Sequence, residues 1–202
     1  MTTQQLFILS EQALTNVFDQ ITQAQFSLIV PMNLRVPKSM QSNEINLKKL
    51  MNNYAYDDAW VPDTLAGKTI AELGNKYDGD LLGGNPKKNW DMIITKAVKA
   101  VRDLTDSDLE RITHLSYGDY PVKDYLWHIT RFRTFGTVDI AQFINVDASL
   151  PEDLIDGMWK ILVPQAEMLR KFGTFGPEVA VSKNAPLYDR LLALSGRQPK
   201  LG

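Results

Sequence analysis

The stretch PVKDYLWHITRFRTFGTVDIAQFIN, residues 121–145, has the spacing of one long helix and decides the fold class. At about 100° per residue, one stripe of this helix turns toward a packed interior. The stripe combines aromatic and small residues with one imidazole and one carboxylate, namely Tyr125, His128, Phe132, Gly136, Asp139 and Phe143. His128 and Asp139 lie roughly 16 Å apart along the axis at about 1.5 Å per residue, so they cannot bind one ion together. We expect both to be structural residues with hydrogen-bond partners, an arginine being a plausible partner for Asp139.

Helical periodicity extends over the rest of the chain. It predicts a helix from about residue 14 to Pro31, a second from about residue 44 to Pro62, a third from Pro86 to about residue 104, and the fourth from Pro121 to Asn145. Short helical turns are expected near 69–74 and 106–108, a fifth helix with a kink at Pro164 begins at Pro151, and a last turn or two covers 186–194. No alternating run is long enough to indicate a sheet. The sequence therefore predicts an all-α protein with one domain, residues 1–202, and a tail from about residue 174 packed on it.

Composition excludes several classes of chemistry. The chain has 202 residues, 44% of them hydrophobic, and a net charge of −2, so no overall positive field favours nucleic acid or an anionic membrane. It contains no cysteine, which excludes disulfides, thiolate metal sites and a cysteine nucleophile. Its two histidines, His114 and His128, are too few for a site with three imidazoles. No targeting signal or bilayer-length apolar run is visible, which predicts a cytoplasmic protein.

Three segments resemble one protein family. The segments DYL (124–126) and VDIA (138–141) are similar to the "DYL…HxWDLA" helix of the mycothiol-dependent maleylpyruvate isomerase-like proteins, in the DinB/YfiT-like superfamily. The segment LMNN (50–53), which runs into YDDAWVPD (56–63), resembles the family's "DLVNH" helix. The ending APLYDRLLALSGR (185–197) is similar to the family's "APLQDRLLALTGR" and is the most specific of the three.

The resemblance implies a four-helix bundle with up-down-down-up connectivity, often dimeric. It also implies a divalent metal, such as zinc or nickel, between the second and fourth helices, which activates a low-molecular-weight thiol. The ligand positions of that family fall here on Asn53 (or Tyr54 if the register slips by one), Phe132 and Gly136. Phenylalanine and glycine offer no ligand atoms, so the usual three-ligand site cannot form. We expect Phe132 to fill the vacated space and Gly136 to leave room for it.

Three functions remain open at this stage. The first is a metal-free protein without a cofactor that binds a small molecule or a partner in the vacated pocket; the pocket candidates are Asn53, Tyr54, Asp57, His128, Phe132, Gly136 and Asp139. The second is a thiol-dependent isomerase or transferase at a rearranged site around His128, Asp57 and Asp58, where His128 and Asp57 could hold a metal ion weakly. The third is a dimeric interaction protein with Trp60 or Trp127 at its interface.

Overall fold

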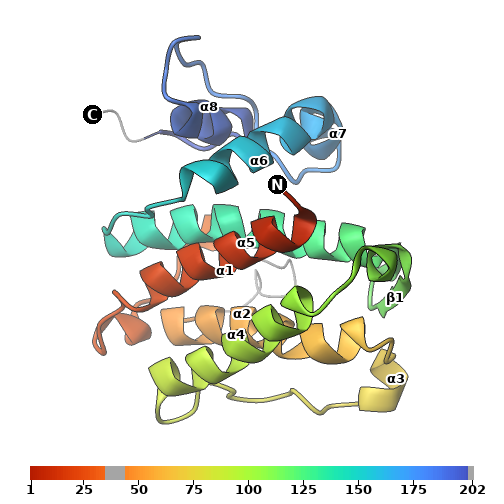
Figure 1. Ribbon diagram of the computed structural model, residues 1–202. Helices are drawn as coiled ribbons and strands as arrows, with labels where there is room; N and C mark the ends of the chain where they lie inside the picture. The colour runs from red at the N-terminus through yellow and green to blue at the C-terminus, as the bar shows by residue number, and fades with distance from the viewer. Residues whose placement is uncertain (35–43, 200–202) are drawn as a thin grey trace. The chain divides into compact units, whose positions relative to one another are not determined.

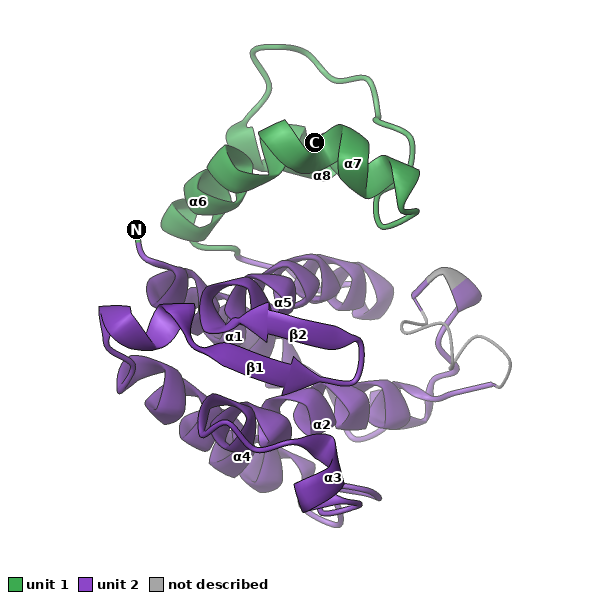
Figure 2. Cartoon of the chain, turned by 90° about the vertical axis from the view of Figure 1, so that its right-hand side faces the viewer, with its two compact units in different colours: residues 1, 150–202 green, residues 2–149 purple. Residues whose placement is uncertain are grey.

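The computed structural model describes residues 1–34 and 44–199. The chain is mostly helical, and its contacts divide it into two compact units, residues 2–149 and residues 150 onward together with Met1 (Figure 2). Among the described residues, no helix is both long and apolar enough to cross a membrane. The single domain predicted from the sequence stays a prediction.

Four long helices make up most of the first unit: α1 (Thr3–Phe18), α2 (Leu47–Leu65), α4 (Pro86–Arg102) and α5 (Val122–Ile144). Helix α1 packs against α5 and α4, and α2 packs against α4. Figure 1 shows α1 and α5 running in one direction while α2 and α4 run in the opposite one. All four helices contribute to one apolar cluster, formed by Phe7, Val61, Leu65, Ala97, Val101, Val122, Tyr125, Leu126 and Ile129.

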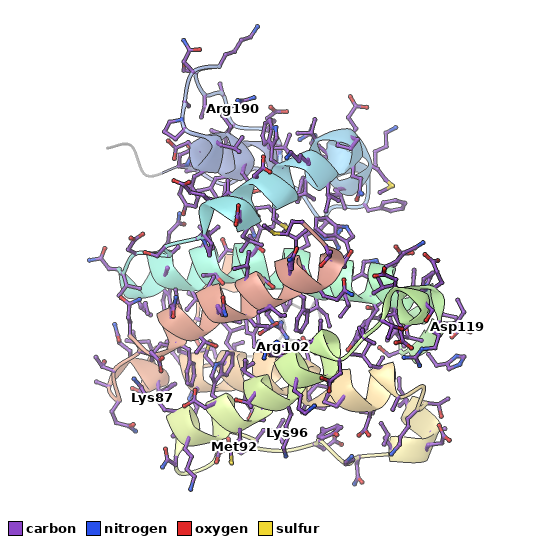
Figure 3. All side chains as sticks on the ribbon, in the orientation of Figure 1. Lys87, Met92, Lys96, Arg102, Asp119 and Arg190 are labelled. Atoms are coloured by element: carbon purple, nitrogen blue, oxygen red, sulfur yellow. The ribbon has the colours of Figure 1, made fainter. Side chains whose placement is uncertain are left out.

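Helix α4 shows how the sequence produces this packing. Pro86 occupies its first turn, where the missing N–H costs no helical hydrogen bond. Trp90 is fully buried, stacks on Phe18 with ring centroids 4.4 Å apart, and donates its indole N–H to Thr15 over 3.0 Å. The opposite face is exposed and carries Met92, Lys96 and Arg102 (Figure 3). The alternation of these two faces confirms the helix predicted from Pro86.

Shorter elements connect the long helices. They are η1 (Gln25–Ser27), η2 (Met32–Leu34), α3 (Ile70–Leu73), η4 (Asp106–Glu110) and an antiparallel hairpin of β1 (Ile112–Leu115) and β2 (Gly118–Pro121). Thr113 pairs with Tyr120 in the hairpin. The hairpin corrects the expectation that the chain holds no sheet, because strands of four residues are too short to give an alternating pattern.

Two predicted helix boundaries were wrong. The first helix begins at Thr3, behind a capping box of Thr2 and Gln5, and ends at Phe18 instead of near Pro31. The helix ends there because the backbone N–H groups of residues 20 and 21 form i to i−3 hydrogen bonds. The Gln25 side chain then accepts a hydrogen bond from the Thr22 backbone N–H. The second helix continues through Pro62 to Leu65, because a proline in the last turn removes only one backbone hydrogen bond.

The second unit contains α6 (Glu152–Leu162), η5 (Val163–Gln165), α7 (Ala166–Lys171) and α8 (Leu187–Leu194). We expected Pro164 to kink a continuous helix. Instead it lies in the 3-10 turn that separates α6 from α7. Helix α6 packs against α8, and the Arg170 side chain donates to the Leu194 carbonyl over 3.0 Å. The predicted terminal helix at 186–194 is confirmed.

Candidate functional site

A pocket of about 370 Å³ lies in the first unit, between α2, α5 and the hairpin. Five aromatic side chains line it: Tyr56, Trp60, Tyr117, Tyr125 and Phe132. Its ionisable lining residues are Asp57, His114, His128 and Arg133. A concave, largely aromatic surface with a few polar groups is typical of a small-molecule site.

The periodicity of the two helices places these residues. Tyr56, Trp60 and Thr64 follow one another at i+4 on α2, so they form one face of the helix. Tyr125, Ile129 and Arg133 have the same spacing on α5. His128 and Phe132, which directly precede Ile129 and Arg133, also line the pocket. The turn between β1 and β2 closes one side of the pocket with Ser116 and Tyr117.

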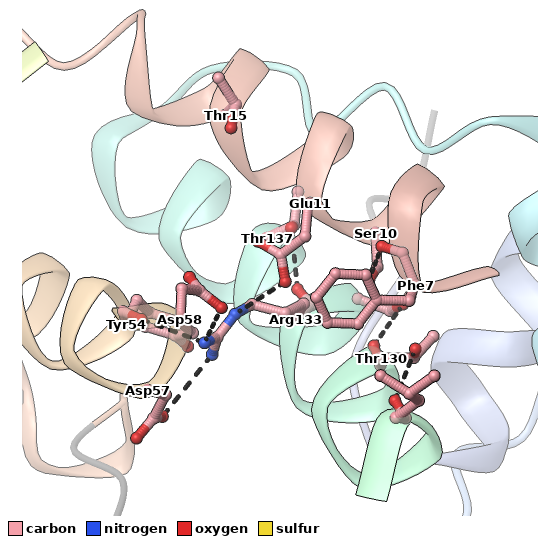
Figure 4. Close-up of polar contacts among 12 residues, drawn as sticks. Phe7, Ser10, Glu11, Thr15, Tyr54, Asp57, Asp58, Thr130, Arg133 and Thr137 are labelled. Carbon is pink, nitrogen blue, oxygen red and sulfur yellow. Dashed lines mark hydrogen bonds and ion pairs between the residues drawn. The ribbon is translucent and has the colours of Figure 1, made fainter. Parts of the chain in front are cut away.

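A buried ion cluster of Glu11, Asp58 and Arg133 lies next to the pocket (Figure 4). All three side chains are fully buried. The Arg133 Nη2 atom lies 2.7 Å from Asp58 Oδ1 and donates to the Tyr54 carbonyl over 3.1 Å, while Arg133 Nε lies 3.2 Å from Glu11 Oε1. The guanidinium also lies 4.8 Å from the centroid of the Tyr54 ring. The cluster therefore ties α1, α2 and α5 together through one cation.

One cation cannot neutralise two buried carboxylates. Burial is the main reason that the pKa of Glu11 lies well above its usual range; the nearby charge of Asp58 adds to the shift, and Arg133 opposes it. Burial also raises the pKa of Asp58, while Arg133 and a hydrogen bond with Glu11 favour its ionised form. The cluster therefore holds more carboxyl groups than cations, with Asp58 as the closest partner of Arg133, and burial favours the neutral acid at Glu11.

Asp57 differs from its neighbour Asp58 because it faces the pocket. Its side chain is 48% exposed, and its Oδ2 atom lies 3.8 Å from Arg133 Nη1. The surrounding protein limits the hydration of this carboxylate, which raises its pKa to about 6 against the opposing effect of Arg133. At neutral pH Asp57 is therefore mostly ionised and accessible from the pocket.

The two histidines lie at the hairpin side of the pocket. His128 Nδ1 lies 3.4 Å from the Tyr117 hydroxyl, and the Tyr120 ring packs edge-on against the imidazole at 5.0 Å between centroids. Burial, together with the charge of Arg131, lowers the pKa of His128, so its imidazole is neutral at pH 7. His114 lies 2.9 Å from Asp119 across the hairpin.

The structure brings together some of the site residues predicted from the sequence. Asp57, His128 and Phe132 line the pocket, whereas Asn53, Tyr54, Gly136 and Asp139 do not belong to its lining. Asn53 and Asp139 are half-buried residues of α2 and α5. Asp58, a candidate for the rearranged site, lies in the buried ion cluster instead.

The space beside Gly136 is filled by Tyr54. The Tyr54 ring stacks on Phe132 with centroids 4.9 Å apart, and a Cβ atom added at Gly136 would lie 2.1 Å from the Tyr54 hydroxyl oxygen. We expected Gly136 to leave room for Phe132, but the room that it leaves is taken by Tyr54. The missing side chain at residue 136 is therefore required by a tyrosine on the facing helix.

Glu11 and Arg133 were not among the site residues predicted from the sequence. Glu11 lies between Phe7 and Leu14 at i+4 and i+3 spacing, on the apolar face of α1, and a carboxylate at such a position indicates a buried partner. Trp60, which was considered for an interface, lines the pocket. A carboxylate on an apolar helix face is therefore the sequence signal that indicates the buried cluster.

The residues at the implied metal position do not fit a divalent ion. Phe132 and Gly136 supply no ligand atoms, and the Tyr54 ring occupies the adjoining space. Among residues 1–34 and 44–199, no group of three or more His, Cys, Asp or Glu residues could hold a metal ion. His128 and Asp57 line the same pocket, but the ion-pair partner of Asp57 is Arg133. No protein-family model, curated protein or solved structure matches this chain.

Proposed function

We propose that this protein is a DinB-like four-helix bundle, related to the maleylpyruvate isomerase-like group, that binds a small molecule without a metal ion. The directions of α1, α2, α4 and α5 support the up-down-down-up connectivity (Figure 1). The pocket between α2 and α5 lies on the two helices that carry the family's ligand positions. The proposed four-helix bundle and the proposed relation to this family are supported by the sequence resemblance together with these helix directions.

One observation carries the proposed loss of metal chemistry. Tyr54 and Phe132 stack in the space where the family's ligands would converge, and Gly136 is in contact with the Tyr54 hydroxyl. Phe132 lines the open volume together with Trp60, Tyr117 and their aromatic neighbours, whereas Tyr54 does not. Such a lining favours binding of a molecule with an apolar body.

Metal content tests the first half of the proposal. Untagged protein is incubated with zinc or nickel, desalted and measured by mass spectrometry. We expect well below one ion per chain, because three or four protein ligands are needed for tight binding. A ratio near one that is abolished in His128→Ala would overturn the metal-free assignment.

Ligand-observed NMR with a library of small aromatic fragments tests the second half. We expect fragments whose saturation transfer is lost in Trp60→Ala, since this variant removes an aromatic wall of the pocket. Trp159→Ala is the matched control, because Trp159 lies in the second unit beneath Arg190. Absence of any fragment sensitive to Trp60 would contradict small-molecule binding at this site.

A thiol-dependent isomerase or transferase is the second candidate, and one observation favours it: His128 and Asp57 line the same pocket. A neutral imidazole at pH 7 could accept a proton from a thiol cosubstrate. Turnover with a thiol cosubstrate by the wild type and not by His128→Ala would establish this function. Equal or absent turnover in both proteins would remove it.

A further inference from the structure

The charges at the pocket wall are not equally accessible. Arg133 lines the pocket, but none of its side-chain surface is exposed, and its Nη2 and Nε atoms already face Asp58, the Tyr54 carbonyl and Glu11. Asp57 keeps about half of its side-chain surface exposed and is 3.8 Å from the nearest Arg133 nitrogen. A ligand that enters the pocket therefore meets an exposed carboxylate beside a guanidinium with no exposed side-chain surface.

Three carboxyl groups share one guanidinium at this wall of the pocket. Arg133 lies 2.7 Å from Asp58, 3.2 Å from Glu11 and 3.8 Å from Asp57. Asp57 is the farthest of the three carboxyl groups from the guanidinium and the one whose side chain is exposed. The imidazole of His128 is neutral at pH 7, and that of His114 is held by Asp119 at 2.9 Å.

The aromatic lining of the pocket also favours a cationic ligand. Tyr56 and Trp60 meet edge-to-face with centroids 6.0 Å apart, and Tyr117 and Phe132 belong to the facing wall. The faces of aromatic rings are negative, so they attract a cation within about 6 Å of the ring centroid. Aromatic side chains together with one carboxylate form the usual surroundings of a bound organic ammonium group.

We infer that the pocket is selective for small organic ammonium ions with an aromatic or apolar body, with the ammonium group on Asp57 and the body against Trp60, Tyr117 and Phe132. This inference rests on the proposed small-molecule function and adds the chemical class of the ligand. We expect ligands with a carboxylate in place of the ammonium group to bind more weakly, because Asp57 repels them and the Arg133 side chain has no exposed surface.

Three probes of similar shape and different charge test the inference: 2-phenylethylammonium, 2-phenylethanol and phenylacetate. Each is titrated at pH 7.5 and low salt by isothermal titration calorimetry. We expect the ammonium probe to bind about tenfold more tightly than the alcohol, and phenylacetate to bind least. In Asp57→Asn the preference for the ammonium over the alcohol should fall to about twofold or less. Asp91→Asn, an exposed change on α4 that alters the net charge equally, should keep the full preference.

The outcomes separate the inference from the function on which it rests. Equal binding of all three probes, or tightest binding of phenylacetate, would overturn the ammonium preference while supporting a small-molecule site. Binding of none of them would count against both. The comparison of the three probes on the wild type decides the matter even if Asp57→Asn is poorly folded. A preference that persists unchanged in folded Asp57→Asn would overturn the role of Asp57.

Discussion

Two consecutive carboxylates of α2 have opposite environments. Asp58 is fully buried and lies 2.7 Å from Arg133, in a cluster of fully buried charged side chains. Asp57 is half exposed on the pocket and lies 3.8 Å from the same guanidinium. One residue of a helix corresponds to a rotation of about 100°, which is enough to separate a structural ion pair from a binding group. The buried cluster therefore stabilises the helices, whereas the exposed carboxylate of Asp57 can bind a ligand.

The largest effect is expected at the shared cation. Arg133→Met leaves Glu11 and Asp58 buried without a counter-charge, so we expect the free energy of unfolding to fall by about 3–5 kcal/mol. Urea unfolding followed by circular dichroism measures the change. Arg102→Met, at an exposed position in the last turn of α4, should cost less than about 1 kcal/mol. A similar small loss in both variants would show that the cluster does not stabilise the fold.

The two neighbouring carboxylates should separate in the same assay. Asp58→Asn removes the closest partner of Arg133, and we expect a loss of about 2–3 kcal/mol, limited by ionisation of Glu11 in its place. Asp57→Asn should change the unfolding free energy by less than about 1 kcal/mol, because its pair is long and half exposed. Equal losses would break the distinction between the two residues.

We expect a loss of unfolding free energy of intermediate size at the contact between Gly136 and Tyr54. Gly136→Ala places a methyl group 2.1 Å from the Tyr54 hydroxyl oxygen, so overpacking should cost about 1–3 kcal/mol. Tyr54→Leu removes the ring that occupies this space, and in the double variant the alanine cost should largely disappear. A double-mutant cycle by urea unfolding measures this coupling. Additive losses in the double variant would contradict the contact.

The sequence predicted the helical class and the positions of α4, α5 and α8, because long apolar periodicity and prolines at helix starts are local signals. It also placed Asp57, His128 and Phe132 at a pocket. The role of Arg133 was not predictable in this way, since its partners Glu11 and Asp58 come from two other helices. The same reason applies to Gly136, because it is the Tyr54 side chain on α2 that leaves no room for a larger residue at this position. Local patterns give the helices, whereas contacts between helices decide which polar residues are buried and which remain open to a ligand.

The smallest expected effect is a pH dependence that belongs to Asp57 alone. Its pKa is raised to about 6, so the carboxylate is mostly charged at pH 7 and mostly protonated at pH 5. If the ammonium probe binds the charged form, its affinity should fall by about tenfold between these pH values, the loss of ionised Asp57 over two pH units. Calorimetric titration of 2-phenylethylammonium at pH 7 and pH 5 measures the ratio, and 2-phenylethanol should change little. Asp57→Asn removes this titration, so the difference in slope between the wild type and the variant measures the contribution of Asp57. An unchanged slope in the variant would show that the pH dependence does not come from Asp57 and would contradict the distinction between Asp57 as a ligand-binding group and Asp58 as a structural one.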